Sequence, residues 1–376
     1  MLVHQTRLPH VLEPGCYRDP AYYERELERV LRPRWHCVAS EEELAEDGAS
    51  LSLDLLGVPL LLRRAGGELR AFRNVCAHRY AALCPPGRHR LSALRCPYHG
   101  WVYDDEGRLR TIPDADSFRG ERELVGRVSL TRCALARIGP LIFVSLAEDP
   151  PALERALDPR THALLARMFT PDHERVMAET LEHPCNWKIP IENVLETYHV
   201  AQLHHNWIAR HPRLVRVFGE AEAGQDAAEH ELAADFSEYR DRMGATLRAY
   251  RALVRTLVGD APCSYRHHHA FPNLILGETP ILSFLQVVTP TGPTRSRSLI
   301  RLYLHRGSPP RAWTAPLRGV VGLGAREFMA TVLREDAAIY PAVQRGVAGT
   351  DRRGVLGARE ERVWAFQRWL AALTAP

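Results

Sequence analysis

CAHR (residues 76–79) and CPYHGWVY (residues 96–103) are the two stretches of the sequence that decide its fold. Each stretch contributes one cysteine and one histidine, and seventeen residues separate the two pairs. Thiolates and imidazoles are ligands for zinc and for iron–sulfur clusters. We expect each pair in a short loop that follows a strand. The sequence therefore predicts a metal site held by two loops of a small β module.

The order of the ligands bears on which metal is bound. Two thiolates and two imidazoles can hold either a tetrahedral zinc ion or a Rieske [2Fe–2S] cluster, in which two histidines replace two cysteines on one iron. Zinc sites usually pair Cys with Cys and His with His, whereas each loop here carries one of each. This order favours the cluster, because each loop can give one ligand to each iron. A zinc-binding structural module is the alternative.

The two motifs resemble the Rieske domain of ring-hydroxylating oxygenase α subunits. The resemblance implies a [2Fe–2S] cluster with the ligands Cys76, His78, Cys96 and His99. Tyr80 departs from the family pattern, which usually has glycine there, so the geometry of the first loop is expected to differ. Tyr98 stands where the Rieske proteins of cytochrome bc complexes carry a further cysteine, so the resemblance is to the oxygenase type.

A second group of candidate ligands lies in NWKIPIENVLETYHVAQLHH (residues 186–205). Glu196 and His199 are three residues apart and share one face of a helix. His199 and His204 are five apart, which is about 140° beyond a full turn. Both can therefore reach one metal only if the helix ends or bulges between them. Two histidines and one carboxylate leave positions open on Fe(II), which suits an ion that binds O2 and admits substrate.

The E-x2-H-x4-H spacing of this segment resembles the catalytic domain of the same oxygenases. The resemblance implies that His199 and His204 bind the mononuclear iron. It also implies that Glu196 bridges this iron to the Rieske cluster of a neighbouring subunit. We interpret the adjacent His205 as a structural residue or a support for the ligands.

The third iron ligand is expected far downstream, in LREDAAIYPAVQRG (residues 333–346), which resembles the late helix of the family. This resemblance implies Asp336 as the ligand, with Glu335 as the alternative. By itself, an acidic pair on an amphipathic helix is typical of solvated surface.

The chain of 376 residues predicts an α+β fold in several parts. We expect an N-terminal helical segment (residues 1–34), a small all-β Rieske domain (35–148) and a catalytic domain (149–376). The apolar runs before the first motif predict strands joined by a hairpin turn at Gly66-Gly67. For the catalytic domain, the resemblance implies an antiparallel sheet flanked by helices, as in helix-grip or START-like folds.

Two weaker signals accompany these motifs. The run His267–His269 is expected to enter a strand, with alternate histidines on opposite faces, and to line a substrate pocket or pack in the core rather than bind metal. Trp187, Trp207 and Tyr265 are interpreted as core packing, with an aromatic wall or cation–π cage as the alternative.

Composition excludes several classes of protein. With 49 basic and 45 acidic residues, the net charge of +4 is too small to indicate nucleic-acid binding. The apolar runs of the chain are too short to span a membrane, and its first residues lack the apolar core of a signal peptide. Eight cysteines in a chain of this length do not indicate a disulfide scaffold. We therefore expect a cytoplasmic protein with reduced thiols.

The two sites together imply a Rieske non-heme iron oxygenase. It is expected to use O2 to hydroxylate, dihydroxylate or oxidatively demethylate a small aromatic or quaternary amine substrate. No G-x-G-x-x-G follows a strand, so electrons from NAD(P)H are expected only through a separate reductase or ferredoxin. The family implies a homotrimer, and a β subunit is not expected. The alternative is a Rieske electron-transfer protein without oxygenase activity.

Overall fold

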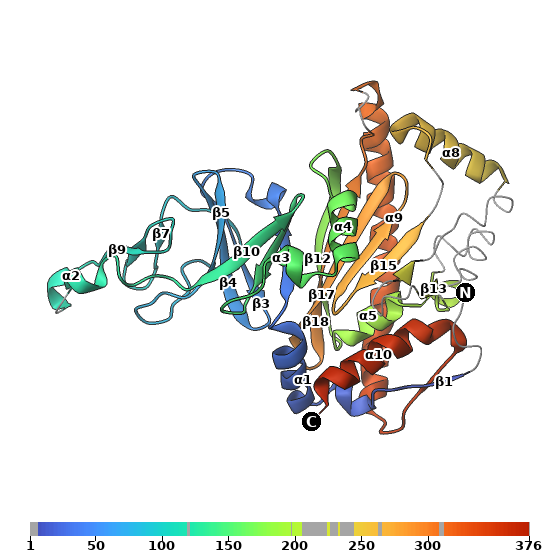
Figure 1. Cartoon of the computed structure of the whole chain (residues 1–376), viewed down its shortest axis with the longest axis horizontal. Coiled ribbons are helices and arrows are strands. Elements are labelled where there is room, and N and C mark those ends of the chain that lie inside the picture. The colour runs from blue at the N-terminus through green and yellow to red at the C-terminus, as the bar shows by residue number, and fades with distance from the viewer. Residues whose placement is uncertain are drawn as a thin grey trace. The chain divides into compact units, whose positions relative to one another are not determined.

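The structure, a computed structural model, describes residues 7–118, 121–196, 198–204, 224–225, 232–233, 244–261, 265–307 and 312–375. Two compact units make up the chain (Figure 1). Leu31–Arg167 form the first, which we call the β unit, and Met1–Val30 with Met168–Pro376 form the second, the mixed unit. The domain boundaries expected at residues 34 and 148 stay predictions.

A seven-stranded antiparallel sheet dominates the β unit, in the order β2-β11-β10-β5-β4-β3-β6. Its strands are β2 (Trp35–Ser40), β3 (Ala49–Leu55), β4 (Val58–Ala65), β5 (Glu68–Arg73), β6 (Gly87–Arg90), β10 (Arg132–Ile138) and β11 (Leu141–Ser145). The hairpin turn expected between β4 and β5 is confirmed. Gly66 and Gly67 both have positive φ, at 58° and 76°, as a tight two-residue hairpin turn requires.

A three-stranded sheet of β7 (Leu94–Arg95), β8 (Val102–Tyr103) and β9 (Leu109–Thr111) carries the second motif. Cys76 follows β5 and Cys96 follows β7, so both motifs lie in loops after strands, as expected. Both cysteines belong to a buried cluster with Trp101 and Tyr103, which fixes the two loops on the core. The unit also contains the short helices α2 (Glu121–Leu124), α3 (Leu153–Ala156) and α4 (Pro159–Met168).

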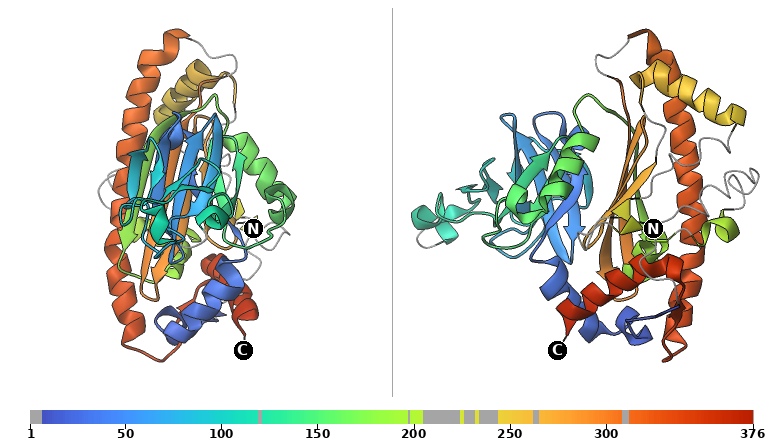
Figure 2. Two further views of the ribbon diagram at one scale, coloured as in Figure 1. Left: turned by 90° about the vertical axis from the view of Figure 1, so that its left-hand side faces the viewer. Right: turned by 45° about the vertical axis from the view of Figure 1, so that its right-hand side comes forward.

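A five-stranded antiparallel sheet, in the order β12-β18-β17-β16-β15, forms the centre of the mixed unit. Its strands are β12 (Glu174–His183), β15 (Arg266–Ala270), β16 (Leu274–Glu278), β17 (Leu282–Gly292) and β18 (Arg295–Leu304). The 34-residue helix α9 (Ala315–Ala348) runs along one face of this sheet and packs on β12 and β18 (Figure 2). The expected α+β class, with an antiparallel sheet flanked by helices, is therefore confirmed.

The mixed unit also contains further α-helices and two small β ribbons. They are β1 (Leu8–Pro9), α1 (Pro20–Glu26), α5 (Lys188–Val194), α6 (Val200–Leu203), β13 (Gly224–Gln225), β14 (Leu232–Ala233), α8 (Gly244–Val258), β19 (Val355–Leu356) and α10 (Glu361–Thr374). Helix α5 packs on α9, and α10 packs on α1 and β1. Among the helices of the described residues, none combines the length and apolar composition that a membrane crossing needs.

Candidate metal centres

The two loops of the first candidate site share one backbone geometry. In the first loop, the amide of Cys76 donates to Ala81 O and the amide of Tyr80 donates to Cys76 O. In the second, Cys96 and Gly100 make the equivalent bonds, to Trp101 O and Cys96 O. Gly100 has a φ of 73° and Tyr80 a φ of 64°. Tyr80 therefore adopts the left-handed conformation that favours glycine, which gives its departure from the family pattern a physical cost.

Aromatic side chains hold the candidate ligands of these loops. The ring of His78 stacks on Trp101 with 4.8 Å between centroids, and meets the ring of His99 edge-on at 4.5 Å. The hydroxyl of Tyr103 lies 3.1 Å from Cys76 Sγ and accepts a hydrogen bond from the amide of Ala77. The two thiols are buried, whereas His99 is exposed. The site thus has an inner edge of sulfur and an outer edge of imidazole.

These residues fit an iron–sulfur cluster. Burial raises the pKa of the Cys76 thiol, and the nearby Cys96 thiol adds to this rise, whereas the Tyr103 hydroxyl opposes it. Two buried thiolates therefore require a positively charged partner. Nδ1 of His78 is shielded from water and has no hydrogen-bond partner among the described residues. Iron would satisfy both the thiolates and this nitrogen.

A break in the helix shapes the second candidate site. Residues 186–203 form two helices, α5 and the single turn α6, and not one continuous helix. His199 caps the start of α6 and His204 its end, where the backbone leaves helical geometry at φ −88° and ψ 70°. The helix therefore ends between the two side chains, as their five-residue spacing requires. His205 and Trp207 lie outside the described residues.

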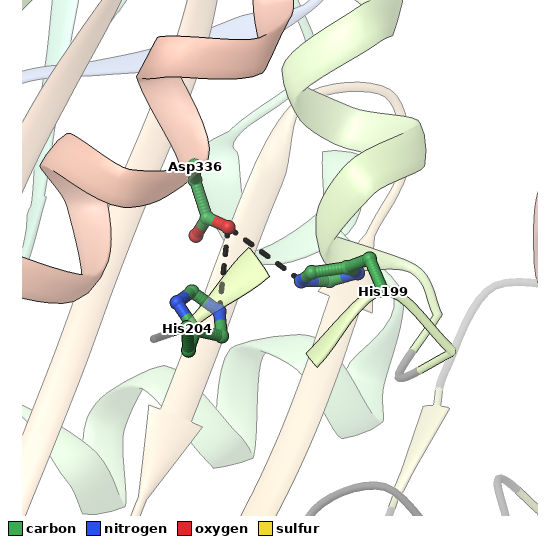
Figure 3. A group of neighbouring side chains, drawn as sticks. All are labelled: His199, His204 and Asp336. Atoms are coloured by element: carbon green, nitrogen blue, oxygen red, sulfur yellow. Dashed lines mark ion pairs between the residues drawn. The ribbon is translucent and has the colours of Figure 1, made fainter. Parts of the chain in front are cut away.

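Asp336, in the middle of α9, faces both histidines (Figure 3). Its Oδ1 lies 3.5 Å from Nε2 of His199 and 3.4 Å from Nε2 of His204. One atom of each residue lies within 4.8 Å of the others. Oδ1 is buried and has no hydrogen-bond partner among the described residues. Two imidazoles and a carboxylate that converge in this way fit a divalent iron on one face of its coordination sphere.

Each of the two histidines is held from behind by its own carboxylate. Nδ1 of His199 contacts Glu196 Oε1, and the amide of His199 donates to Glu196 Oε2. Nδ1 of His204 lies 2.9 Å from Glu335 Oε2. These contacts leave Nε2 of each ring directed at Asp336. Carboxylates in this position orient ligating imidazoles and make them more basic.

The charges of the second site depend on one another. Burial lowers the pKa of His199, but the hydrogen bond and charge of Glu196, with the charge of Asp336, raise it above its ordinary value. Burial also raises the pKa of Asp336, and the two histidines only partly oppose this rise. A buried carboxylate of this kind gains a compensating charge when it binds a metal cation.

Sequence reasoning did not identify the contact of Glu335 with His204. Glu335 was considered only as a substitute for Asp336, although neighbours on a helix point about 100° apart and can take different roles. The run His267–His269 enters strand β15, as expected. Trp187 is fully buried and donates to Glu26, so it packs in the core.

Two family models match the chain. The model described as "Ring hydroxylating alpha subunit (catalytic domain)" covers residues 171–375, and the "Rieske [2Fe-2S] domain" covers residues 34–129. The chain therefore belongs to the family of ring-hydroxylating oxygenase α subunits, with a Rieske domain and a catalytic domain.

Curated relatives share about a third of the matched residues. The glycine betaine monooxygenase oxygenase subunit of Chromohalobacter salexigens is 32% identical over 208 residues, which is 54% of this chain and 45% of the relative. The anthranilate 1,2-dioxygenase large subunit of Burkholderia cepacia is 31% identical over 209 residues, 53% of this chain and 48% of the relative. The matched part thus spans about half the length of these relatives.

Solved structures share the fold at lower sequence identity. The quaternary ammonium Rieske monooxygenase CntA, in complex with L-carnitine, has a TM-score of 0.72 at 19% identity and covers 97% of this chain and 95% of its own. Naphthalene 1,2-dioxygenase with indole bound has a TM-score of 0.72 at 18% identity and covers 100% and 94%. The fold of the whole chain is therefore that of Rieske oxygenases.

Proposed function

We propose that the chain is the oxygenase component of a Rieske non-heme iron enzyme. It uses O2 and externally supplied electrons to hydroxylate, dihydroxylate or oxidatively demethylate a small organic substrate. The observation that carries this proposal is the position of Asp336 Oδ1, which is buried, has no hydrogen-bond partner among the described residues and faces Nε2 of both His199 and His204. In an electron-transfer protein without a second metal, the two histidines would only partly offset the burial of this carboxylate.

The proposed ligands divide between two cofactors. Cys76, His78, Cys96 and His99 hold the [2Fe–2S] cluster, and His199, His204 and Asp336 hold the mononuclear Fe(II). When bound, the cluster supplies single electrons and the open iron activates O2. The protein orients both groups: Trp101 and Tyr103 fix the cluster ligands, and Glu196 and Glu335 fix the iron histidines.

Electrons are proposed to come from a separate reductase or ferredoxin, and from NAD(P)H only through it. We also propose a cytoplasmic homotrimer in which Glu196 of one subunit connects its iron site to His78 or His99 of a neighbour's cluster. Support comes from the exposure of the His99 imidazole and from the position of Glu196 on the outer nitrogen of His199.

Metal analysis and electron paramagnetic resonance of anaerobically purified protein test this function. The expected result is about three irons per chain and a Rieske signal after reduction with dithionite, because a [2Fe–2S] cluster and one iron are present. Asp336→Ala should lower the iron to about two per chain and keep the signal, and Cys76→Ser should abolish the signal. A wild-type protein with about two irons per chain would indicate electron transfer alone. A colourless zinc protein would exclude both the oxygenase function and the electron-transfer function.

A further inference from the structure

One buried arginine of the mixed unit lacks the partners that such a residue normally has. Arg362, in the first turn of α10, is only 3% exposed. Its Nε and Nη2 are shielded from water and have no hydrogen-bond partner among the described residues. Arg63 and Arg301 are equally buried, yet Arg63 donates to Asp105 and Leu91 O, and Arg301 donates to backbone carbonyls. Arg362 is therefore an exception that needs an explanation.

The missing partners would be expected to cost stability. A guanidinium stays charged in proteins, and a buried charge without hydrogen bonds is strongly disfavoured. Burial lowers the pKa of Arg362 to about 10, although the charges of Tyr265 and the adjacent Glu361 oppose this. The group thus remains a cation at neutral pH. An anionic ligand would supply the partners that Nε and Nη2 lack among the described residues.

The unpaired atoms define the shape of this anion. Nε and Nη2 form one edge of the guanidinium, and their two parallel N–H groups match the two oxygens of a carboxylate. His267 and Tyr265 lie near Arg362, since its charge lowers the pKa of each. Their rings are parallel, with 6.2 Å between centroids. Burial lowers the pKa of His267 well below its ordinary value, and Arg362 lowers it further, so His267 is a neutral hydrogen-bonding group.

This cluster lies on the face of the sheet that also faces the candidate iron site. On β15, His267 and His269 point to one face, because side chains alternate along a strand, and His269 contacts Phe366 of α10. Strand register continues that face across the sheet to His183, whose ring meets Tyr340 of α9. Tyr340 lies one turn beyond Asp336. The register and these ring contacts therefore place the Arg362 cluster and Asp336 on the same face of the sheet.

We propose that Arg362, with His267 and Tyr265, binds a carboxylate group of the substrate, so that the enzyme acts on small organic carboxylates. The Nε–Nη2 edge of Arg362 donates two hydrogen bonds to the carboxylate, which fixes the orientation of the substrate relative to Asp336. This inference rests on the proposed oxygenase function and narrows its substrate class.

Binding of paired probes tests the inference on the metal-loaded protein without O2. Calorimetry compares benzoate with benzamide, and glycine betaine with choline, since each pair differs in the carboxylate. We expect at least one carboxylate to bind about tenfold tighter than its neutral counterpart. Arg362→Gln should weaken that carboxylate by about 10- to 100-fold, the range for a lost charge-assisted pair, and leave the neutral probe unchanged. Arg362→Lys should give an intermediate loss.

The matched control is Arg368→Gln, which removes the same charge from the exposed side of α10, where Arg368 lies over Trp364. This variant should change neither the affinity for the carboxylate nor the affinity for the neutral probe. The inference is overturned if wild-type protein prefers neither carboxylate or binds none, or if Arg362→Gln weakens both probes of a pair equally while iron content is intact. Iron content separates the two proposals: loss of the mononuclear iron from wild type refutes the oxygenase function, whereas full iron without carboxylate preference refutes only this inference.

Discussion

Lys188 and Glu26 form an ion pair inside the mixed unit, with 2.6 Å between Nζ and Oε1 and neither side chain exposed. The pair joins α1 to α5, the helix that leads into the candidate iron site. The rings of Tyr17 and Tyr22 lie 5.0 and 5.4 Å from the ammonium, and Trp187 donates to the other oxygen of Glu26. This polar group in the core therefore has both charge and hydrogen bonds satisfied.

Removal of one partner should destabilise the protein strongly. Lys188→Met leaves Glu26 buried without a counter-charge, and we expect the free energy of unfolding to fall by about 3–5 kcal/mol. The double variant with Glu26→Gln should recover part of this loss. Urea unfolding provides the measurement. Arg353→Met, which breaks an exposed pair with Glu13, is the control and should change stability by less than about 0.5 kcal/mol; an equal effect of both variants would contradict the assignment.

The sequence predicts this protein well where the chemistry is local. The two Cys/His pairs, of which Cys76 and His78 are the first, predict metal-binding loops, and the five residues from His199 to His204 indicate where a helix must end. Contacts between segments that are far apart in the sequence cannot be predicted in this way. Glu26 and Lys188 are 162 residues apart, and only the packing of α1 on the rest of the unit brings them together. The same holds for Arg362, which is buried only in the folded unit and whose Nε and Nη2 lack hydrogen-bond partners within the described part of the chain.

The strained conformation of Tyr80 predicts a stabilising substitution. A left-handed non-glycine residue costs about 1–2 kcal/mol, and Tyr80 is 82% exposed, so its ring contributes little packing. Tyr80→Gly should therefore raise the stability of the β unit by about 0.5–1 kcal/mol, after the greater freedom of glycine in the unfolded chain is counted. The temperature at which the visible absorbance of the cluster disappears measures this effect.

The equivalent position of the second loop is the control for Tyr80. At Gly100, a Cβ would lie 3.1 Å from Pro113 Cγ at a positive φ, so Gly100→Ala should lower stability by about 1–2 kcal/mol. If Tyr80→Gly lowered the melting temperature as well, the tyrosine ring would have to contribute packing that its exposure does not indicate.

His36 should make the β unit sensitive to acid. Its Nε2 donates to Leu31 O at 2.8 Å, and its buried Nδ1 has no partner among the described residues. Burial lowers the pKa of His36 to about 4. The hydrogen bond to Leu31 raises this pKa, whereas the charge of Arg34 lowers it. In the unfolded chain the pKa is near 6.5, so between these values the unfolded state binds the proton and stability falls as pH falls. The loss at pH 5 should be about 2 kcal/mol.

Urea unfolding between pH 8 and 5 measures this dependence. His36→Gln keeps a donor for Leu31 O but cannot titrate. At pH 5, the stability that this variant loses should therefore be about 2 kcal/mol smaller than the stability that wild type loses. Identical pH profiles for the two proteins would show that His36 titrates alike in the folded and unfolded states.

Substitutions at Glu335 and Asp336 should separate the ligand from its support. Asp336→Asn removes the carboxylate between the two histidines, so we expect loss of the mononuclear iron while the cluster is retained. Glu335→Gln keeps a hydrogen-bond acceptor for Nδ1 of His204 but removes its charge. Iron affinity should then fall by about 10- to 100-fold, as for other carboxylates behind a ligating histidine, and iron should still bind when supplied in excess.

Iron content after dialysis against a graded series of chelator concentrations distinguishes these two cases. Glu327→Gln is the control, because it removes an equal charge from the same helix. Since Glu327 lies outside the site, this variant should retain iron like wild type. The roles must be exchanged if Glu335→Gln loses iron even in excess while Asp336→Asn retains it. In that event the carboxylate that now contacts Nδ1 of His204 would have to turn toward the metal, and Asp336 would be left as the buried group that orients it.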